Sequence, residues 1–486
     1  MSNPLSALEP KALWENFSAL NAVPRPSKKE EKVIAFMIDF GQSLNLFTHQ
    51  DEVGNVIIKK PATAGMENRK AVVLQSHLDM VHQKNADTNF DFATQGIDMF
   101  VDGDWVKAKG TTLGADNGIG VASIMAILAS KDIPHPAIEA LFTIDEETGM
   151  TGALGLKGGL LDAKILLNLD TEDDHELTIG CAGGIDVTGT RHYAEKEPLP
   201  GCVGFKLVVK GLTGGHSGMD IHLGRGNANK LMNRLLLAAH KEVHIELASL
   251  DGGGLRNAIP RESKATLVVL AEHKEQFVQI VQAQANIFKA EYRITDPKLE
   301  VVIEEVSGIE KVMEKHFQTH LLQVLHVMPN GIYRMTPGID GLVQTSNNIA
   351  RVLVGEGNLS IQCLTRSSVD SEKMDLAHTI DSAFHLLGAS TELKGSYPGW
   401  TPLPDAEIVK LMSAQYEKTF GTLPHVNACH AGLECGILGT NYPGMQMISF
   451  GPNIRGAHSP DETVQISSVQ KFWKFLLETL QQIPSN

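Results

Sequence analysis

Apolar residues in the first part of the chain follow two periodicities. Strands are predicted from apolar runs at 55–60, 71–77, 137–145 and 163–170. Continuous runs of this kind are typical of strands that are buried on both faces of a sheet. Helical spacing occurs at 5–21, 28–45 and 118–130. Strands that alternate with helices predict a mostly parallel sheet.

The pattern changes near residue 187. A strand at 202–212 runs into a glycine-rich turn, and another strand is predicted at 265–272. Long helical patterns lie near 226–245, 273–293 and 308–328. From residue 404 to the end, two helix patterns flank a strand at 444–453. The middle of the chain therefore predicts an α+β insert between two parts of one α/β domain.

The predicted fold class is α/β. The first domain, residues 1–187 and 392–486, has a mostly parallel mixed sheet flanked by helices, and residues 188–391 form the inserted domain. A chain of 486 residues with 42% hydrophobic and 20% charged residues is typical of a globular protein with a large core. This composition excludes disordered, collagen-like and coiled-coil proteins.

The charge and the cysteine content indicate which binding partners and which cellular compartment to expect. The formal net charge is −15 at pH 7, so we expect neither nucleic acid nor a membrane surface as a partner. There is no signal-peptide pattern and no apolar run long enough to span a bilayer. The five cysteines include no C-x-x-C pair, which argues against a disulfide framework. We expect a cytoplasmic protein.

Histidine and acidic residues follow the predicted strands. His77 and Asp79 come at the end of one strand, Glu146 and Glu147 follow the next, and Asp170 closes a third. Ligands of open α/β sheets bind outside the carboxyl ends of the strands, so these side chains are expected to converge on one site.

Two further residues extend this set. Asp116 precedes a predicted helix, and His458 lies in a loop after a predicted strand. Imidazole nitrogen combined with carboxylate oxygen suits zinc, manganese or cobalt. A site with two metal ions needs a shared carboxylate, which Asp116 could supply. Taken singly, each of these histidine and acidic residues is more typical of a structural role. We interpret the acidic run after Asp170, residues 171–176, as a surface loop.

Several motifs together resemble a known family. The motifs SHLDMV, GADNG, DEETG, NLD and GAHSPDE resemble those of the M20 metallopeptidases in order and spacing; they lie at 76–81, 114–118, 145–149, 168–170 and 456–462. Further motifs resemble the branch of that family that hydrolyses aminoacyl-histidine dipeptides. These are GGHSG, LRNAIPRE, YPGW and HAGLECG, at 214–218, 255–262, 397–400 and 430–436.

The resemblance implies a catalytic domain interrupted by a lid domain, through which two subunits form a homodimer. It implies two Zn²⁺ ions per subunit, with Co²⁺ or Mn²⁺ as substitutes. His77 and Asp170 would bind one ion, Glu147 and His458 the other, and Asp116 would bridge them.

The resemblance also implies catalytic and substrate-binding roles. Glu146 would be the general base acting on a metal-bridging hydroxide, and Asp79 would orient His77. A cis peptide bond is implied between Asp116 and Asn117.

In the insert, the implied substrate-binding residues are His216, Asn257, Arg366 and Gly432. His216 would polarise the scissile carbonyl, and Asn257 and Arg366 would bind the terminal carboxylate of the peptide. Without the family, His216 would be interpreted as a turn residue and Arg366 as a surface residue.

Three positions need separate mention. His82 stands where the family often has proline, and we expect only a local difference in the loop. Cys429 and Cys435 flank the HAGLE segment, and we interpret both as buried small side chains.

We therefore predict a zinc-dependent dipeptidase for small unblocked dipeptides, including Xaa-His; whether β-Ala-His is also a substrate is left open by the sequence. Alternatives with the same metal residues are a tripeptide aminopeptidase and a deacylase of N-acyl amino acids. A requirement for a free amino group would distinguish them. A non-catalytic scaffold is an alternative of another class, which the complete ligand set and Glu146 argue against.

Overall fold

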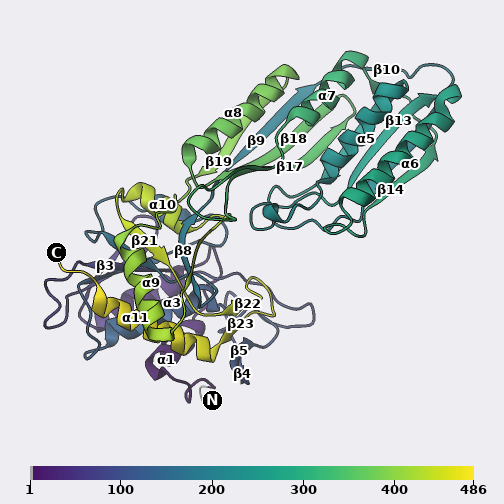
Figure 1. Ribbon diagram of the computed structural model, residues 1–486. Helices are drawn as coiled ribbons and strands as arrows, with labels where there is room; N and C mark the ends of the chain where they lie inside the picture. The colour runs from purple at the N-terminus through teal and green to yellow at the C-terminus, as the bar shows by residue number, and fades with distance from the viewer. Residues whose placement is uncertain (1–3) are drawn as a thin grey trace. The chain divides into compact units, whose positions relative to one another are not determined.

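The computed structural model describes residues 4–486, and the chain divides into two compact units. Unit 1 comprises the residues up to Gly180, together with Trp400–Ala428 and Leu433–Asn486. Unit 2 comprises Cys181–Gly399 and the short segment Cys429–Gly432. The two units are therefore made from interleaved parts of the chain, which the colours of Figure 1 follow.

The larger sheet of unit 1 has eight strands in the order β1-β2-β6-β3-β7-β21-β8-β20. In that order they are β1 (Phe47–Gln50), β2 (Val56–Lys60), β6 (Ile138–Thr143), β3 (Val72–His77), β7 (Ile165–Asn168), β21 (Gln446–Ser449), β8 (Glu176–Cys181) and β20 (His425–Cys429). The central strands β6, β3, β7 and β21 are parallel to one another. Every residue of β3, β6 and β7 is buried, as expected for strands covered on both faces.

The helices of unit 1 bury apolar faces in this core. They are α1 (Lys11–Asn21), α2 (Glu31–Ser43), α3 (Ala115–Ala129), α4 (Thr151–Gly155), α9 (Glu407–Phe420), α10 (Glu434–Asn441) and α11 (Ile466–Gln482). Helix α3 is apolar and buried around nearly its whole circumference, and it packs against α1 and β3. Helices α9 and α11 contact each other (Figure 1).

A second sheet in unit 1 is antiparallel and has four strands in the order β22-β23-β5-β4. They are β22 (Ile454–Arg455), β23 (Thr463–Gln465), β5 (Trp105–Ala108) and β4 (Met99–Asp102). The loop between β22 and β23 carries His458, and the second sheet therefore anchors that loop at both ends.

Unit 2 is built on an antiparallel sheet of nine strands. Eight of them lie in one continuous row, and the ninth, β16, pairs with β17. The strands, in spatial order, are β14 (Glu300–Val306), β11 (Cys202–Lys210), β13 (Ser263–Leu270), β12 (Ile245–Gly253), β17 (Val343–Gly355), β18 (Asn358–Ser367), β9 (Gly183–His192) and β19 (Ser390–Tyr397), with β16 (Gly331–Met335) paired to β17. A separate pair consists of β10 (Glu195–Lys196) and β15 (Val312–Met313). Along β11, buried residues alternate with partly exposed ones, so one face of that strand points to a core.

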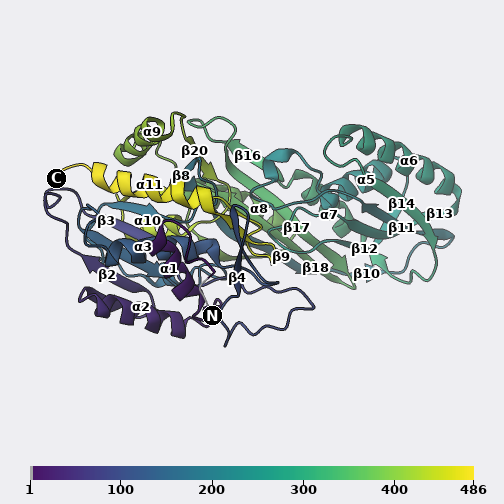
Figure 2. The ribbon, with the colours of Figure 1, turned by 90° about the horizontal axis from the view of Figure 1, so that it is seen from below.

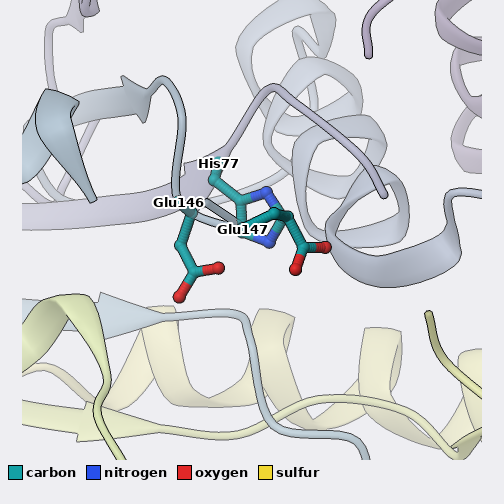
Figure 3. A group of neighbouring side chains, drawn as sticks. All are labelled: His77, Glu146 and Glu147. Carbon is teal, nitrogen blue, oxygen red and sulfur yellow. The ribbon is translucent and has the colours of Figure 1, made fainter. Parts of the chain in front are cut away.

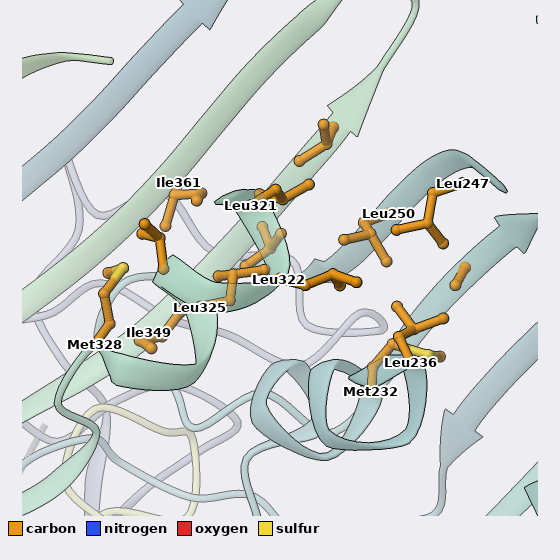
Figure 4. Packing of buried hydrophobic residues seen from close by; sticks show 14 of the residues in the cluster. Met232, Leu236, Leu247, Leu250, Leu321, Leu322, Leu325, Met328, Ile349 and Ile361 are labelled. Atoms are coloured by element: carbon orange, nitrogen blue, oxygen red, sulfur yellow. The ribbon is translucent and has the colours of Figure 1, made fainter. Parts of the chain in front are cut away.

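Four helices form a layer on this sheet (Figures 1 and 2). They are α5 (Ala228–Glu242), α6 (Lys274–Glu291), α7 (Lys315–Val327) and α8 (Asp370–Leu386), with the short 3₁₀ helices η1 (Ile221–Leu223) and η2 (Ala271–His273) between strands and helices. Figure 4 shows part of the resulting core, in which Leu236 of α5 and Leu322 of α7 lie among residues of the sheet such as Leu250.

The predicted fold class is confirmed: a mixed sheet with parallel central strands and flanking helices is interrupted by an α+β insert. The helix predicted at 308–328 begins only at Lys315. Its first predicted residues instead include β15, and the side chain of Glu314 caps the helix by accepting from two backbone amides. Strands β17 and β18 were not predicted, because buried polar residues interrupt their apolar pattern.

None of the helices within residues 4–486 combines the length and apolar character needed to cross a bilayer.

Replacing Phe277 by alanine should destabilise unit 2. Phe277 of α6 is fully buried and contacts Phe205, with ring centroids 5.1 Å apart. Truncating such a side chain leaves a cavity and costs about 3–5 kcal/mol. Denaturant titration should show the loss in the unfolding transition of unit 2. Ile294→Ala is the matched control because Ile294 is 80% exposed, and a similar loss in both variants would contradict the packing argument.

Candidate metal centre and substrate-binding residues

The seven residues predicted for metal binding and catalysis all belong to unit 1. His77 ends β3, and the segments after β6 and β7 carry Glu146, Glu147 and Asp170. Parallel strands end at the same edge of the sheet, which is why residues far apart in sequence meet here. Asp116 joins them from the first turn of α3, beside a cis peptide bond between Asp116 and Asn117 that confirms the prediction.

The carboxylate of Asp116 lies between two histidines. Its Oδ1 is 3.1 Å from Nε2 of His77, and its Oδ2 is 3.3 Å from Nε2 of His458. His77 Nε2 is also 3.5 Å from Oδ1 of Asp170, and His458 Nε2 is 3.0 Å from Oε2 of Glu147. Asp116 thus contributes one oxygen to each of two groups of potential ligands.

The chemistry of these two groups fits metal ions. In each group, one histidine nitrogen and two carboxylate oxygens lie within 4.8 Å of one another. Such donors suit zinc, cobalt or manganese. In addition, Oε1 of Glu147 is buried and has no hydrogen-bond partner within the described part of the chain. A buried carboxylate oxygen without a donor is costly unless a cation reaches it.

The carboxylates lie so close together that they raise the pKa values of some of their own members. Burial, together with the charges of Asp116 and Glu147, raises the pKa of Asp170 to about 6. Burial also raises the pKa of Glu146 well above its usual range, with added repulsion from Asp170 and Glu434. Cations bound between these carboxylates would remove much of this repulsion.

Glu146 and Glu147 leave the loop in different directions (Figure 3). Glu147 lies next to the ring of His77, and Glu146 leaves the backbone in another direction, yet one oxygen of each glutamate and one nitrogen of His77 lie within 4.8 Å of one another. Their backbone amides both donate to the carboxylate of Asp79, at 3.0 and 3.3 Å. Asp79 also accepts from the hydroxyl of Ser27 at 2.8 Å. Adjacent glutamates can therefore hold different positions at the site.

Asp79 also lies beside His77. Its Oδ1 is 3.4 Å from Nδ1 of His77, and the backbone carbonyl of Asp79 lies 3.2 Å from the same nitrogen. An acceptor at Nδ1 places the proton there and leaves Nε2 free to face Asp116 and Asp170. Asp79 is fully buried, and its hydrogen bonds outweigh burial and lower its pKa.

Glu462, which has no predicted role from the sequence, holds the loop before Asp116. One of its carboxylate oxygens accepts from the amides of Leu113 and Gly114 at 2.7 and 2.9 Å, and the other from those of Ala115 and Asp116 at 2.7 and 3.2 Å. Glu462 is 3% exposed. It ends a motif already noticed in the sequence, so its position was visible but its partners were not.

Arg25 supports the same loop from the other side. Its guanidinium donates to the carbonyls of Leu78 and Asp79 at 3.0 Å and to the carbonyl of Gly114 at 2.5 Å. It thereby joins the end of β3 to the loop before α3. Nothing in the local sequence distinguishes Arg25 from a surface arginine.

Glu434 is another buried carboxylate that the sequence did not single out. Its Oε2 accepts from the amide of Gln75 and the hydroxyl of Thr143, both at 2.7 Å. Burial raises the pKa of Glu434 to about 7. This side chain connects α10 to β3 and β6, the two strands that lead to His77 and Glu146.

The four residues predicted to bind substrate all belong to unit 2. His216 follows β11 in a glycine-rich turn, which pairs with the segment of Asn257: the amide of Ser217 donates to the carbonyl of Asn257 at 2.7 Å. Asn348 of β17 fixes that segment by donating to the carbonyls on either side of Asn257, at 3.1 and 2.8 Å.

Arg366 and the segment before Gly432 both contact Gly218, which lies in the same turn as His216. A side chain there would lie 2.1 Å from the carbonyl oxygen of His430, 3.1 Å from Nε of Arg366 and 3.1 Å from the ring of His216. Only a residue without a Cβ fits such a contact. Gly432 comes two residues after His430, whose ring is 2.8 Å from the hydroxyl of Ser346. Unit 2 therefore brings the four predicted residues into one neighbourhood.

The hydrogen bonds of His216 define its tautomer. Its Nδ1 accepts from the amides of Gly218 and Met219, at 3.2 and 2.9 Å. Burial and the charge of Arg366 lower the pKa of His216, which favours the neutral ring. A neutral ring that accepts at Nδ1 carries its proton on Nε2, where it can be donated to a carbonyl oxygen.

His82, Cys429 and Cys435 lie outside the ligand groups. His82 contacts Phe92, with ring centroids 5.9 Å apart. Cys435 is buried as expected, whereas Cys429 is only partly buried, since it lies at the end of β20.

Comparison with known proteins gives consistent matches. The family model of peptidase family M20/M25/M40 matches residues 73–482. The chain is 44% identical over 482 residues to the cytosol non-specific dipeptidase of Escherichia coli (strain K12), and the alignment covers 99% of each protein. It is also 44% identical to the crystal structure of aminoacylhistidine dipeptidase from Vibrio alginolyticus, with a TM-score of 0.95 and coverage of 99% and 98%. Aminopeptidase PepT from Bacillus cereus shares the fold at 14% identity, with a TM-score of 0.56 and coverage of 98% and 99%.

Replacing Glu462 by glutamine should weaken metal binding by the whole protein. The amide nitrogen of glutamine would face two of the four backbone N–H donors, so the loop that carries Asp116 would shift. We expect a loss of about 2–3 kcal/mol in stability and a Zn²⁺ affinity lowered by about 10–100-fold. Calorimetric titration of EDTA-treated protein with Zn²⁺ measures the affinity. Glu407→Gln removes only an exposed ion pair with Lys70 and should match the wild type; equal affinities for all three proteins would contradict the role of Glu462.

Proposed function

Because the chain belongs to peptidase family M20, we propose that it is a zinc-dependent dipeptidase that hydrolyses unblocked dipeptides, including Xaa-His. The observation that carries this proposal is the carboxylate of Asp116, which faces His77 with one oxygen and His458 with the other. The names of the two relatives at 44% identity, a cytosol non-specific dipeptidase and an aminoacylhistidine dipeptidase, support the substrate class.

The proposed centre holds two Zn²⁺ ions, for which Co²⁺ or Mn²⁺ could substitute. His77 and Asp170 would bind one, Glu147 and His458 the other, and Asp116 both. When bound, the ions would polarise the scissile carbonyl and make water a better nucleophile at neutral pH.

In this proposal Glu146 is the general base. It takes a proton from the attacking water and delivers it to the nitrogen of the leaving amino acid. Its position supports the role, because one of its oxygens lies within 4.8 Å of ligand atoms of both His77 and Glu147. The carboxylate of Asp79 positions Glu146 by accepting from the backbone amide of that residue, and it favours the tautomer of His77 with the proton on Nδ1.

The residues of unit 2 would recognise the peptide itself. Arg366 and Asn257 bind the terminal carboxylate, and a backbone contact at Gly432 leaves room for the chain. His216 donates its Nε2 proton to the carbonyl oxygen, where negative charge develops in the transition state. The two amides at Nδ1 of His216 support this orientation of the ring.

We also propose a homodimer formed through residues 188–391, which would act as a lid, and a cytoplasmic location. Both follow from the family resemblance, and the name of the Escherichia coli relative supports the second.

Hydrolysis of a matched substrate set tests the function. The zinc-loaded protein should cleave Ala-His, leave Ala-Ala-His and N-acetyl-Ala-His intact, and lose activity with EDTA; β-Ala-His in the same set shows whether a β-amino residue is accepted. Preferred cleavage of the tripeptide would favour an aminopeptidase, and preferred cleavage of the acetylated compound a deacylase. Product formation is followed by liquid chromatography.

Replacing Glu146 by glutamine should abolish turnover while metal stays bound. Glutamine keeps the size of the side chain but cannot accept the proton, so we expect kcat to fall by at least about 100-fold. Metal content by atomic emission should equal that of the wild type, which separates this effect from ligand loss. Unchanged kcat would remove Glu146 from the mechanism, and absence of turnover in the wild type would favour a scaffold.

A further inference from the structure

Arg366 is a buried cation without a carboxylate partner. Arg366 is 5% exposed, and within residues 4–486 no carboxylate oxygen lies at ion-pair distance from its guanidinium. Asp186 lies close enough to feel the charge of Arg366, but its carboxylate is paired with Arg256 at 3.3 Å. Burying a guanidinium in this way is costly unless an anionic ligand completes its hydrogen bonds.

The hydroxyl of Tyr397 holds one end of this guanidinium. Nη1 of Arg366 donates to Oη of Tyr397 at 2.8 Å, and this is the one hydrogen bond that Arg366 makes through its side chain to the described residues. Nε of Arg366 is buried and has no acceptor among them. The edge of the guanidinium that carries Nε and Nη2 is therefore left for a ligand, and that edge matches a carboxylate in a bidentate arrangement.

The sheet of unit 2 explains how Tyr397 reaches Arg366. Gly184 of β9 is the register partner of Arg366 on β18 and of Tyr397 on β19, so the three residues form a row across three strands. A Cβ at Gly184 would lie 2.6–2.7 Å from the hydroxyl and ring of Tyr397. The tyrosine ring thus lies across the glycine, and any side chain at position 184 would displace it.

A register shift and a hydrogen bond keep Tyr397 in place. The register of β9 and β19 shifts between Lys394 and Tyr397, which brings the tyrosine opposite Gly184. The ammonium group of Lys373 donates to the carbonyl of Tyr397 at 2.6 Å. Burial raises the pKa of Tyr397, so the hydroxyl stays protonated at neutral pH and can accept from Arg366 while keeping its own proton.

We propose that Tyr397 is a positioning residue that turns the Nε–Nη2 edge of Arg366 toward the free terminal carboxylate of the substrate. The inference rests on the proposed function, in which Arg366 binds that carboxylate. It adds a residue that sets specificity. Without the hydroxyl of Tyr397, the terminal side-chain torsions of Arg366 would be less restricted, and its guanidinium would not be held in one orientation. Discrimination between a peptide acid and the matching peptide amide should then decline.

The test compares Ala-His with its C-terminal amide, Ala-His-NH₂, in the full-length zinc-loaded enzyme. For Tyr397→Phe, KM for Ala-His should rise about tenfold, the change that corresponds to a hydrogen bond of about 1.4 kcal/mol, with kcat within about twofold. The kcat/KM for the amide should not change, because a neutral amide cannot use the bidentate edge. The acid-to-amide ratio is measured on one preparation, so it does not depend on the fraction of folded enzyme.

Tyr193→Phe is the matched control. Tyr193 is also a buried tyrosine of unit 2, and its hydroxyl has no partner among the described residues, so the ratio should stay at the wild-type value. A wild-type ratio in Tyr397→Phe, or an equal loss on acid and amide, would overturn the inference. If the wild-type enzyme cleaved acid and amide equally well, the proposed role of Arg366 would fail first, and absence of dipeptide cleavage would reject the proposed function itself.

Discussion

The structure of unit 1 depends on how it accommodates negative charge at one edge of its sheet. Asp79, Asp116, Glu147 and Asp170 are all largely buried there, and their carboxylates repel one another. The protein satisfies some of these groups itself: Asp79 accepts from Ser27 and from two backbone amides. The carboxylates that remain face His77 and His458 and raise the pKa of both histidines, that of His458 to about 11 through its contacts with Asp116 and Glu147, so this edge favours positive charge. The fold is therefore arranged so that cations complete it.

Much of this arrangement follows from sequence because the ligands lie at the ends of apolar strands. The runs before His77 and Asp170 predict β3 and β7, and the topology of a parallel sheet then brings the two residues together. Glu462 and Arg25 were missed for the opposite reason. Their partners are backbone groups almost 350 and about 90 positions away along the chain, and no side-chain pattern records such contacts. Strands β17 and β18 escaped prediction because their buried residues near Arg366 are polar, and hydrogen bonds rather than apolar packing satisfy them.

The two units carry opposite electrostatic preferences. The edge of the sheet in unit 1 attracts cations, whereas the predicted substrate-binding residues of unit 2 include Arg366, a buried permanent cation. Burial and the nearby charge of Arg366 lower the pKa of His430 to about 3, so that histidine stays neutral. The pKa of His216 is lowered for the same reasons. Neutral histidines next to Arg366 can donate or accept hydrogen bonds without competing with it for an anion.

Preorganisation explains why unit 2 tolerates a buried arginine that lacks an acid. A carboxylate on a neighbouring strand would stabilise the free protein, but it would also occupy the edge that a ligand needs. A tyrosine hydroxyl orients the guanidinium without neutralising it, and so leaves its full charge for the ligand. This solution requires a glycine between the two side chains, since the ring must lie across β9 at Gly184. Burial of an unpaired Arg366 costs folding free energy. A ligand whose anionic group has two oxygens offsets this cost on binding, because it completes the hydrogen bonds of the guanidinium.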